Sequence, residues 1–347
     1  MNRYPSPFRQ TPVSSFQVVY GLACLTLLGS FCTGSIGQTQ CEAQSPVPGS
    51  AIHVTHVLGF EGVRHNATGD LRIQGDTVQF QKDGSPTAQV KLSSIQDIFV
   101  EDEDRQVGGT AMMLGKTAAP YGGGRVVSLF AHKKYDILTV QYLDNNGGFH
   151  DAIFELDKGQ GQTFKKDLVA NGAHISSPDD RATTQSAPEF NRRGTQPWSV
   201  QVDSVDRGDV GLQPSFGAAI YENLLEELAK TKQFKQLFRD GDRNANDVTS
   251  LLTLKTKVQN YTPGSETRRA VTTVNGATKL NVRIQLVTPD GHVVVENVVN
   301  GNVRFFGDNL RATHNLAHNI AETLKRSTLP EGAEPVSDRE TGQSKLN

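Results

Sequence analysis

Hydrophobic and polar residues alternate along short segments between residues 52 and 172, which predicts β-strands. The clearest case is a hairpin, in which residues 71–73 and 78–80 flank the turn Gly75-Asp76. Because side chains of a strand point alternately to the two faces of a sheet, the apolar residues of each segment share one face. The same pattern predicts further strands at residues 90–92, 95–100, 125–130, 136–143 and 149–156.

An amphipathic helix is expected to close this first region. Phe164, Leu168 and Val169 recur at helical spacing within residues 161–171, and Gly172 follows where a C-terminal cap belongs. Antiparallel strands that end in one helix predict a small β-barrel or sandwich whose open end the helix covers.

Residues 52–173 resemble the pleckstrin-homology-like fold. The resemblance is carried by the hairpin Gly69-Asp70-Leu71 and Asp76–Phe80 and by the terminal helix. It implies a partly open barrel and, as one possible function, binding of a lipid headgroup or another small ligand. The cations available for such a ligand are Arg64, Arg72, Lys82, Lys133 and Lys134.

A long loop is expected at residues 101–124, which carry the acidic run 101–104 and the glycines 122–124. A loop of this length is typically mobile or functional. Together with the edges of the sheets, it is the first surface on which we expect a partner to bind.

The second half of the chain predicts another folded region. Residues 174–197 are rich in Ser, Thr, Pro, Gln and charge, which indicates a linker. Beyond it, alternation and helical periodicity predict two long helices on one face of a mainly antiparallel sheet, so the overall class is α+β. The predicted elements are strands at 198–202, 252–258, 280–287 and 292–299 and helices at 216–238 and 308–326, the latter capped by Asp308.

This second region resembles envelope-protein domains related to CsgG and to the amino-terminal domain of TolB. The resemblance rests on Pro263-Gly264-Ser265 with Arg268-Arg269, on residues 276–280, on Asp290-Gly291 and on the closing helix. It implies a non-enzymatic periplasmic or outer-membrane-associated module.

The amino-terminal segment has the order of a secretory signal. Arg3 and Arg9 precede the apolar stretch 18–31, and small residues stand at the −3 and −1 positions before Gln38. A stretch of fourteen residues is short for a membrane-spanning helix, so cleavage is favoured over an uncleaved anchor. We therefore expect export to the periplasm or cell envelope.

The cysteines predict neither a disulfide nor a lipid anchor. Cys24 and Cys32 lie in the apolar stretch, so Cys41 would be the single thiol of the mature chain. Phe31 before Cys32 and Gln40 before Cys41 replace the small residue that lipidation requires. The near balance of 35 basic and 37 acidic side chains also argues against a nucleic-acid partner.

Several short patterns suggest chemistry but are incomplete. Gly115-Lys116-Thr117 lacks the glycine that a phosphate-binding loop needs at position 110, and the acidic segment 240–247 lacks the glycine and the final acid of a calcium loop. His314 and His318 could share a metal, but Asn315 replaces the glutamate of the metalloprotease motif. We predict no catalytic, cofactor-binding or metal-binding residue.

The sequence therefore favours an exported, non-catalytic structural or protein-interaction module. Its partner would be another envelope protein, with contact to a membrane surface as a further option and the oligomeric state left open. An enzyme whose site is assembled from distant residues is the other alternative. The predicted organisation is a signal peptide (1–37), a disordered segment (38–51), the barrel region (52–173), a linker (174–197), the α+β region (198–327) and a disordered tail (328–347).

Overall fold

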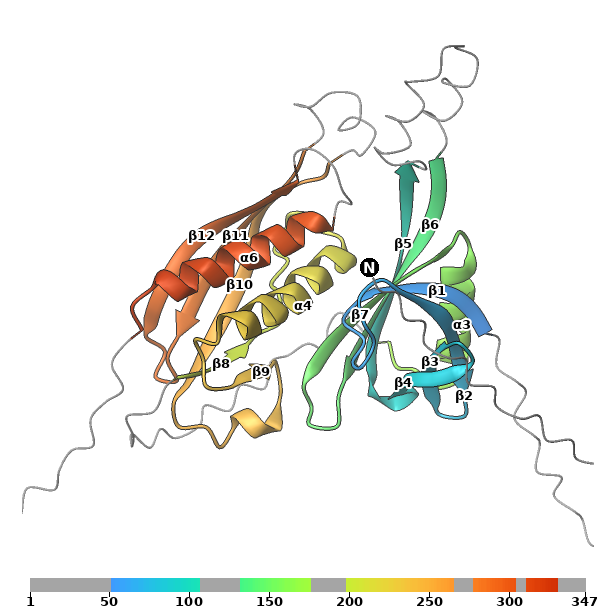
Figure 1. Cartoon of the computed structure of the whole chain (residues 1–347), viewed down its shortest axis with the longest axis horizontal. Helices are drawn as coiled ribbons and strands as arrows, with labels where there is room; N and C mark the ends of the chain where they lie inside the picture. The colour runs from blue at the N-terminus through green and yellow to red at the C-terminus, as the bar shows by residue number, and fades with distance from the viewer. Residues whose placement is uncertain (1–50, 107–131, 176–197, 265–276, 304–309, 330–347) are drawn as a thin grey trace, which may run out of the picture. The chain divides into compact units, whose positions relative to one another are not determined.

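The computed structural model describes residues 51–106, 132–175, 198–264, 277–303 and 310–329. All of them belong to one compact unit, Pro46–Asn347. This part of the chain contains two β-sheets and three α-helices (Figure 1). The predicted α+β class is confirmed.

The first sheet has seven strands in the order β4-β3-β2-β1-β7-β6-β5, and every neighbouring pair is antiparallel. The predicted hairpin is present, with Leu71 opposite Phe80 and Ile73 opposite Val78. The elements are β1 (Ala51–Leu58), β2 (Ala67–Gln74), β3 (Thr77–Lys82), β4 (Ser85–Lys91), the 3₁₀ turn η1 (Leu92–Ser94), β5 (Ile95–Gln106), β6 (His132–Leu143), β7 (Phe149–Asp157) and α3 (Gln160–Ala170).

The first sheet is not a closed barrel. Strands β4 and β5 stand at opposite ends of its order, and no ladder joins them in the described residues. The terminal helix α3 is present as predicted, and its Phe164 and Leu168 are fully buried in the core of this sheet. The buried carboxylate of Asp136 fixes the start of α3, because it accepts hydrogen bonds from the N–H groups of Gly159 and Gly161 at 2.9 Å.

The acidic run 101–104 lies in a strand, not in the predicted loop. It continues β5, and Glu101 stands opposite Ile137 of β6. Glu101 is half-buried and accepts a hydrogen bond from the N–H of Ser215 at 3.2 Å. Ladder pairing with β6 therefore overrides the low strand propensity of consecutive acids.

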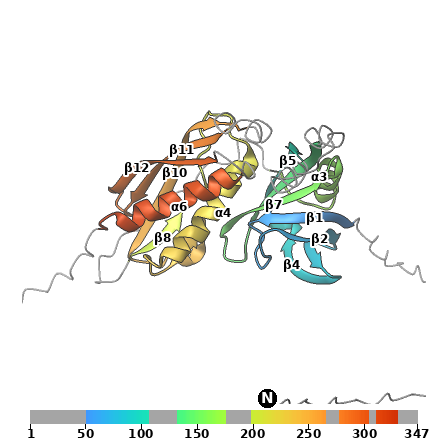
Figure 2. The ribbon, with the colours of Figure 1, turned by 45° about the horizontal axis from the view of Figure 1, so that its top comes forward.

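The second sheet has five strands in the order β12-β11-β10-β8-β9. Strand β11 is antiparallel to both of its neighbours, β10 and β12, whereas β8 runs parallel to both β10 and β9. Helices α4 and α6 lie side by side over one face (Figure 2). The elements are β8 (Ser199–Val202), α4 (Pro214–Thr231), β9 (Leu237–Arg239), the 3₁₀ turn η4 (Arg243–Ala245), β10 (Leu251–Thr262), β11 (Thr278–Val287), β12 (Val293–Val303) and α6 (Arg311–Arg326).

Helix α4 is shorter than predicted. It ends at Thr231 because Lys232 adopts a left-handed conformation with φ of 55°, and the chain then enters β9. Phe238, which the helical pattern placed in the helix, is instead buried as part of this short strand.

Helix α6 was predicted correctly apart from its first residues. It begins at Arg311 with Leu310 as the flanking residue, and the predicted cap Asp308 lies outside the described residues. Its apolar face is buried, and Thr313 accepts a hydrogen bond from the Asn223 side chain of α4 at 3.0 Å.

The two sheets share hydrophobic contacts. Leu58, Ile137 and Ile153 of the first sheet belong to the same buried cluster as Ile220 and Leu224 of α4. The division at residues 174–197 stays a prediction, and most of that segment lies outside the described residues.

Other predictions fall outside the described part of the chain. They are the signal segment with its cysteines, the strand at 125–130, the Gly115-Lys116-Thr117 motif, Arg268-Arg269 and the carboxyl-terminal tail from residue 330. Among the described residues, no helix has the length and hydrophobicity needed to cross a bilayer.

Candidate functional site

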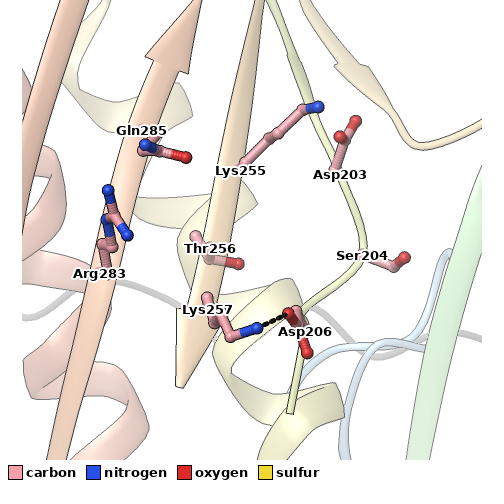
Figure 3. A pocket seen from close by; sticks show the side chains of 8 residues that line it. All are labelled: Asp203, Ser204, Asp206, Lys255, Thr256, Lys257, Arg283 and Gln285. Carbon is pink, nitrogen blue, oxygen red and sulfur yellow. Dashed lines mark ion pairs between the residues drawn. The ribbon is translucent and has the colours of Figure 1, made fainter. Parts of the chain in front are cut away.

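The strongest candidate site is a hollow of about 230 Å³ on the face of the second sheet opposite α4 and α6 (Figure 3). Residues of β10 and β11 and of the segment that follows β8 form its wall. Apolar residues of β10, such as Leu254 and Val258, are buried, whereas Lys255 and Lys257 are exposed on the opposite face. We refer to this second surface as the open face.

Parallel pairing brings three charged residues into one row beside the hollow. Val202 of β8 is paired with Arg239 of β9 and with Leu254 of β10. The next residue of each strand is therefore Asp203, Asp240 and Lys255, respectively. The carboxyl ends of parallel strands are where open α/β sheets commonly bind ligands, because the chains diverge there.

Two further cations complete the polar wall. Lys257 lies opposite Arg283, and Lys255 lies opposite Gln285, all on the open face. The ammonium group of Lys257 is 3.0 Å from the carboxylate of Asp206.

Glu296 of β12 orients the side chains from β11. Its carboxylate accepts a hydrogen bond from the Gln285 amide at 3.1 Å and forms an ion pair with Arg283 at 2.5 Å. The side-chain carbonyl oxygen of Gln285 takes no part in this hydrogen bond. The wall therefore presents both donors and acceptors, which suits a polar ligand.

Asp203 is the most perturbed carboxyl group of the hollow. Burial raises its pKa to about 7, the nearby charge of Asp240 adds to this rise, and Lys255 opposes it. A carboxyl group that is partly protonated at neutral pH and lines a hollow is typical of functional sites.

We expect Asp203→Asn to stabilise the protein at pH 8.5 but not at pH 5. Between the pKa that Asp203 has in the unfolded chain and about 7, the folded state binds the proton of Asp203 more tightly than the unfolded chain does. The free energy of unfolding therefore falls as the pH rises through 7. The substitution removes this loss and should raise Tm by about 2–5 °C at pH 8.5. Thermal unfolding followed by circular dichroism measures the difference, and an equal shift at both pH values would contradict the raised pKa.

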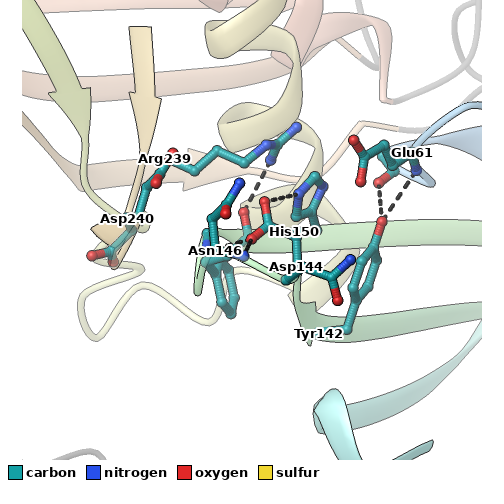
Figure 4. Close-up of polar contacts among 12 residues, drawn as sticks. Glu61, Tyr142, Asp144, Asn146, His150, Arg239 and Asp240 are labelled. Carbon is teal, nitrogen blue, oxygen red and sulfur yellow. Dashed lines mark hydrogen bonds and ion pairs between the residues drawn. The ribbon is translucent and has the colours of Figure 1, made fainter. Parts of the chain in front are cut away.

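A second polar cluster is buried between β7, α4 and β9 (Figure 4). Arg239 makes two hydrogen bonds of 2.8 Å to the carboxylate of Glu222 and one of 3.0 Å to the carbonyl oxygen of Phe149. Glu222 also accepts a hydrogen bond from the N–H of Asp151 at 3.0 Å. Because the Arg239–Glu222 ion pair is hydrogen-bonded to the backbone of β7, it joins the first sheet to the second.

His150 lies next to this ion pair. Its ring is stacked on Tyr142 with centroids 4.8 Å apart, and its Nε2 is 3.3 Å from a carboxylate oxygen of Asp144. The Nδ1 atom is buried and has no hydrogen-bond partner among the described residues.

We expect stability to fall as pH drops below about 6.5, with part of the loss due to His150. Burial lowers its pKa, and the charge of Arg239 lowers it further, so the unfolded chain takes up a proton that the folded state refuses. His56, whose pKa burial also lowers, contributes in the same direction. Urea unfolding should show that the free energy of unfolding falls less between pH 7 and pH 5 in His150→Phe than in the unaltered chain. Equal falls in both proteins would contradict a lowered pKa of His150.

The histidine pair of α6 is exposed and faces a carboxylate. Nδ1 of His318 is 3.1 Å and Nδ1 of His314 is 3.9 Å from the carboxylate of Glu227, which also pairs with Lys230 at 2.7 Å. In the described residues, no group of three or more metal-ligating side chains is suited to hold an ion. The acidic segment after β9 forms η4, where Asp242 accepts a hydrogen bond from the N–H of Asn244.

The cations predicted for the first region are not gathered at one point. Arg64 is exposed between β1 and β2, Arg72 is half-buried in β2, and Lys82 is exposed at the end of β3. Lys134 is exposed in β6, which is separated from β2 by β1 and β7. Lys133 lies in the same strand, and its side chain is outside the described part. Headgroup binding by this region remains a prediction.

Sequence reasoning did not bring together the residues of the hollow or those of the buried cluster. A single strand at residues 198–202 gave no sign that it would pair in parallel, and without that pairing Asp203 and Asp240 are unrelated. The available signal was the position of each aspartate directly after an apolar strand segment.

No family model and no curated protein matches the chain. Structural similarity is found to two crystal forms of the PelC dodecamer from Paraburkholderia phytofirmans, one of them a variant with a leucine replaced by methionine. They are 16% and 13% identical, cover 40% and 39% of this chain and 95% and 92% of PelC, and have TM-scores of 0.29 and 0.30. An uncharacterised protein is similar at 11% identity, with 40% and 97% coverage and a TM-score of 0.24.

Proposed function

We propose that this chain is an exported, non-catalytic binding protein of the bacterial cell envelope that contacts its partner through the open face of the second sheet. The observation that carries the proposal is the polar hollow between the carboxyl end of β8 and the strands β10 and β11. The basic, apolar and small residues in residues 1–37 support export.

The scaffold suits a binding role because the hollow stands on ordered strands. Lys255, Lys257, Arg283 and Gln285 all project from paired positions of β10 and β11. Side chains that project from paired strands are positioned more sharply than those on loops. The helices α4 and α6 cover the other face and bury the apolar residues, which leaves the polar face open for contact.

The experiment combines fractionation with capture of a partner. The full chain with a carboxyl-terminal tag is expressed in a bacterial host, fractionated and crosslinked. Two double variants are compared with the unaltered chain. The open-face variant combines Lys255→Glu with Arg283→Glu. The control, called the α6 variant, combines Lys325→Glu with Arg326→Glu at exposed positions of α6.

We expect the chain in the envelope fraction, and the same crosslinked partner with the unaltered chain and the α6 variant but not with the open-face variant. Retention in the cytoplasm would contradict export. A partner recovered equally with all three proteins would contradict the open face as the contact surface.

A further inference from the structure

We infer that the hollow on the open face binds an oxyanion group, a phosphate or a carboxylate, between Lys255, Lys257 and Arg283. This inference rests on the proposed function for the choice of face. Anion binding is nevertheless measured on the purified chain, so it can fail or succeed separately from export and partner capture.

The spacing of the cations suits a single small anion. Lys255 and Lys257 are two residues apart on one strand, about 7 Å along its axis, and Arg283 is opposite Lys257 on the next strand, about 5 Å away. All three line the same hollow. Long, flexible side chains from these positions can converge on one anion, where charge-assisted hydrogen bonds are stronger than neutral ones.

Part of this donor capacity is unused in the described residues. Lys255 has no ion pair there, and the buried Nε of Arg283 donates to no group. Lys257 and Arg283 each hold one carboxylate, Asp206 and Glu296, which keeps both side chains extended over the face. An incoming oxyanion would satisfy the donors that these pairs leave open.

Protonation of Asp203 makes the hollow more favourable to an anion. Three basic side chains and two carboxyl groups, Asp203 and Asp206, line the hollow, and Glu296 and Asp240 stand beside it. The hydrogen-bond donors of Lys255 and Arg283 therefore carry the preference for an anion, and the charge around them becomes less negative when Asp203 takes up a proton. The groups that face Asp203 are Asp240 and Lys255. Anion binding should consequently strengthen as pH falls.

The test is calorimetric titration of the full chain with sulfate, phosphate and acetate at constant ionic strength, with chloride as the reference ion. The variant Lys255→Gln with Arg283→Gln should weaken sulfate binding about tenfold or more, because it removes two charge-assisted contacts. The control Lys279→Gln lies on the same face of β11, outside the hollow, and should change the Kd less than about twofold.

Equal sulfate binding by the unaltered chain and the double variant would overturn the inference, as would an equal loss in Lys279→Gln. Stronger binding of phosphate and sulfate than of acetate assigns a phosphate ligand, and the reverse assigns a carboxylate. Circular dichroism verifies folding, and the single variants carry the test if the double variant does not fold.

The pH dependence is tested with sulfate, which does not titrate in this range. The Kd of the unaltered chain should fall several-fold from pH 8 to pH 6, and Asp203→Asn should remove most of this change. A Kd that is constant with pH in the unaltered chain would contradict the place of Asp203 beside the bound anion.

Discussion

Arg239→Met is expected to lower the free energy of unfolding by about 3 kcal/mol. The substitution leaves the carboxylate of Glu222, which is only 7% exposed, without its cation, and an unpaired buried charge is costly. It also removes the hydrogen bond to the carbonyl oxygen of Phe149. Urea unfolding at pH 7 measures the loss.

A double-mutant cycle separates the ion pair from the loss of packing. Glu222→Gln with Arg239→Met should be more stable than Arg239→Met alone, because no buried charge then remains. Arg326→Met is the matched control, since Arg326 is 80% exposed and its pair with Glu322 contributes little. A loss below about 1 kcal/mol for Arg239→Met would contradict the role of this pair in joining the sheets.

The ion pair also joins parts of the chain that the sequence placed in two regions. In the sequence Glu222 stands opposite the apolar stripe of its helix, where a solvated side chain is expected. In the fold that face packs on β7, and the glutamate becomes buried. Helical periodicity shows which side of a helix is polar, but not which neighbour covers that side.

Local patterns predicted most of the elements correctly because they depend on near neighbours. The hairpin β2–β3, the helix α3 and the antiparallel strands β10 to β12 follow from alternation, turn residues and caps. The end of α4 was wrong because Phe234, Leu237 and Phe238 continue the helical spacing by coincidence. Lys232 ends the helix in a left-handed conformation, and the chain then enters β9, which pairs with β8.

The candidate site could not be predicted, since every part of it depends on pairing between distant segments. Asp203 and Asp240 are brought together by parallel strands, and Lys257 and Arg283 by an antiparallel pair. The sequence shows only isolated charges at these positions. By contrast, the first-region cations were chosen from a resemblance, and the strand order separates Arg72 from Lys134.

We expect Gly59→Ala to lower the free energy of unfolding by about 2–5 kcal/mol. No other single added methyl group should cost more where the two sheets meet. Gly59 has φ of 85°, and an added Cβ would overlap the carbonyl oxygen of Asp151. It would also approach the side chain of Glu222 at 3.1 Å, so the β7 backbone and the buried ion pair would both have to move.

Gly75→Ala is the matched control because it isolates the cost of the backbone conformation. Gly75 also has positive φ, of 60°, but an added Cβ would have no atom within 4 Å. We expect it to lose about 1 kcal/mol, measured by the same urea unfolding. If Gly59→Ala lost no more than Gly75→Ala, the close approach of the chain at Gly59 to β7 would be contradicted. Gly59→Ala can also be introduced into the Arg239→Met variant. If it then costs less than in the unaltered chain, the added methyl group acts through the ion pair, since neighbouring sites couple.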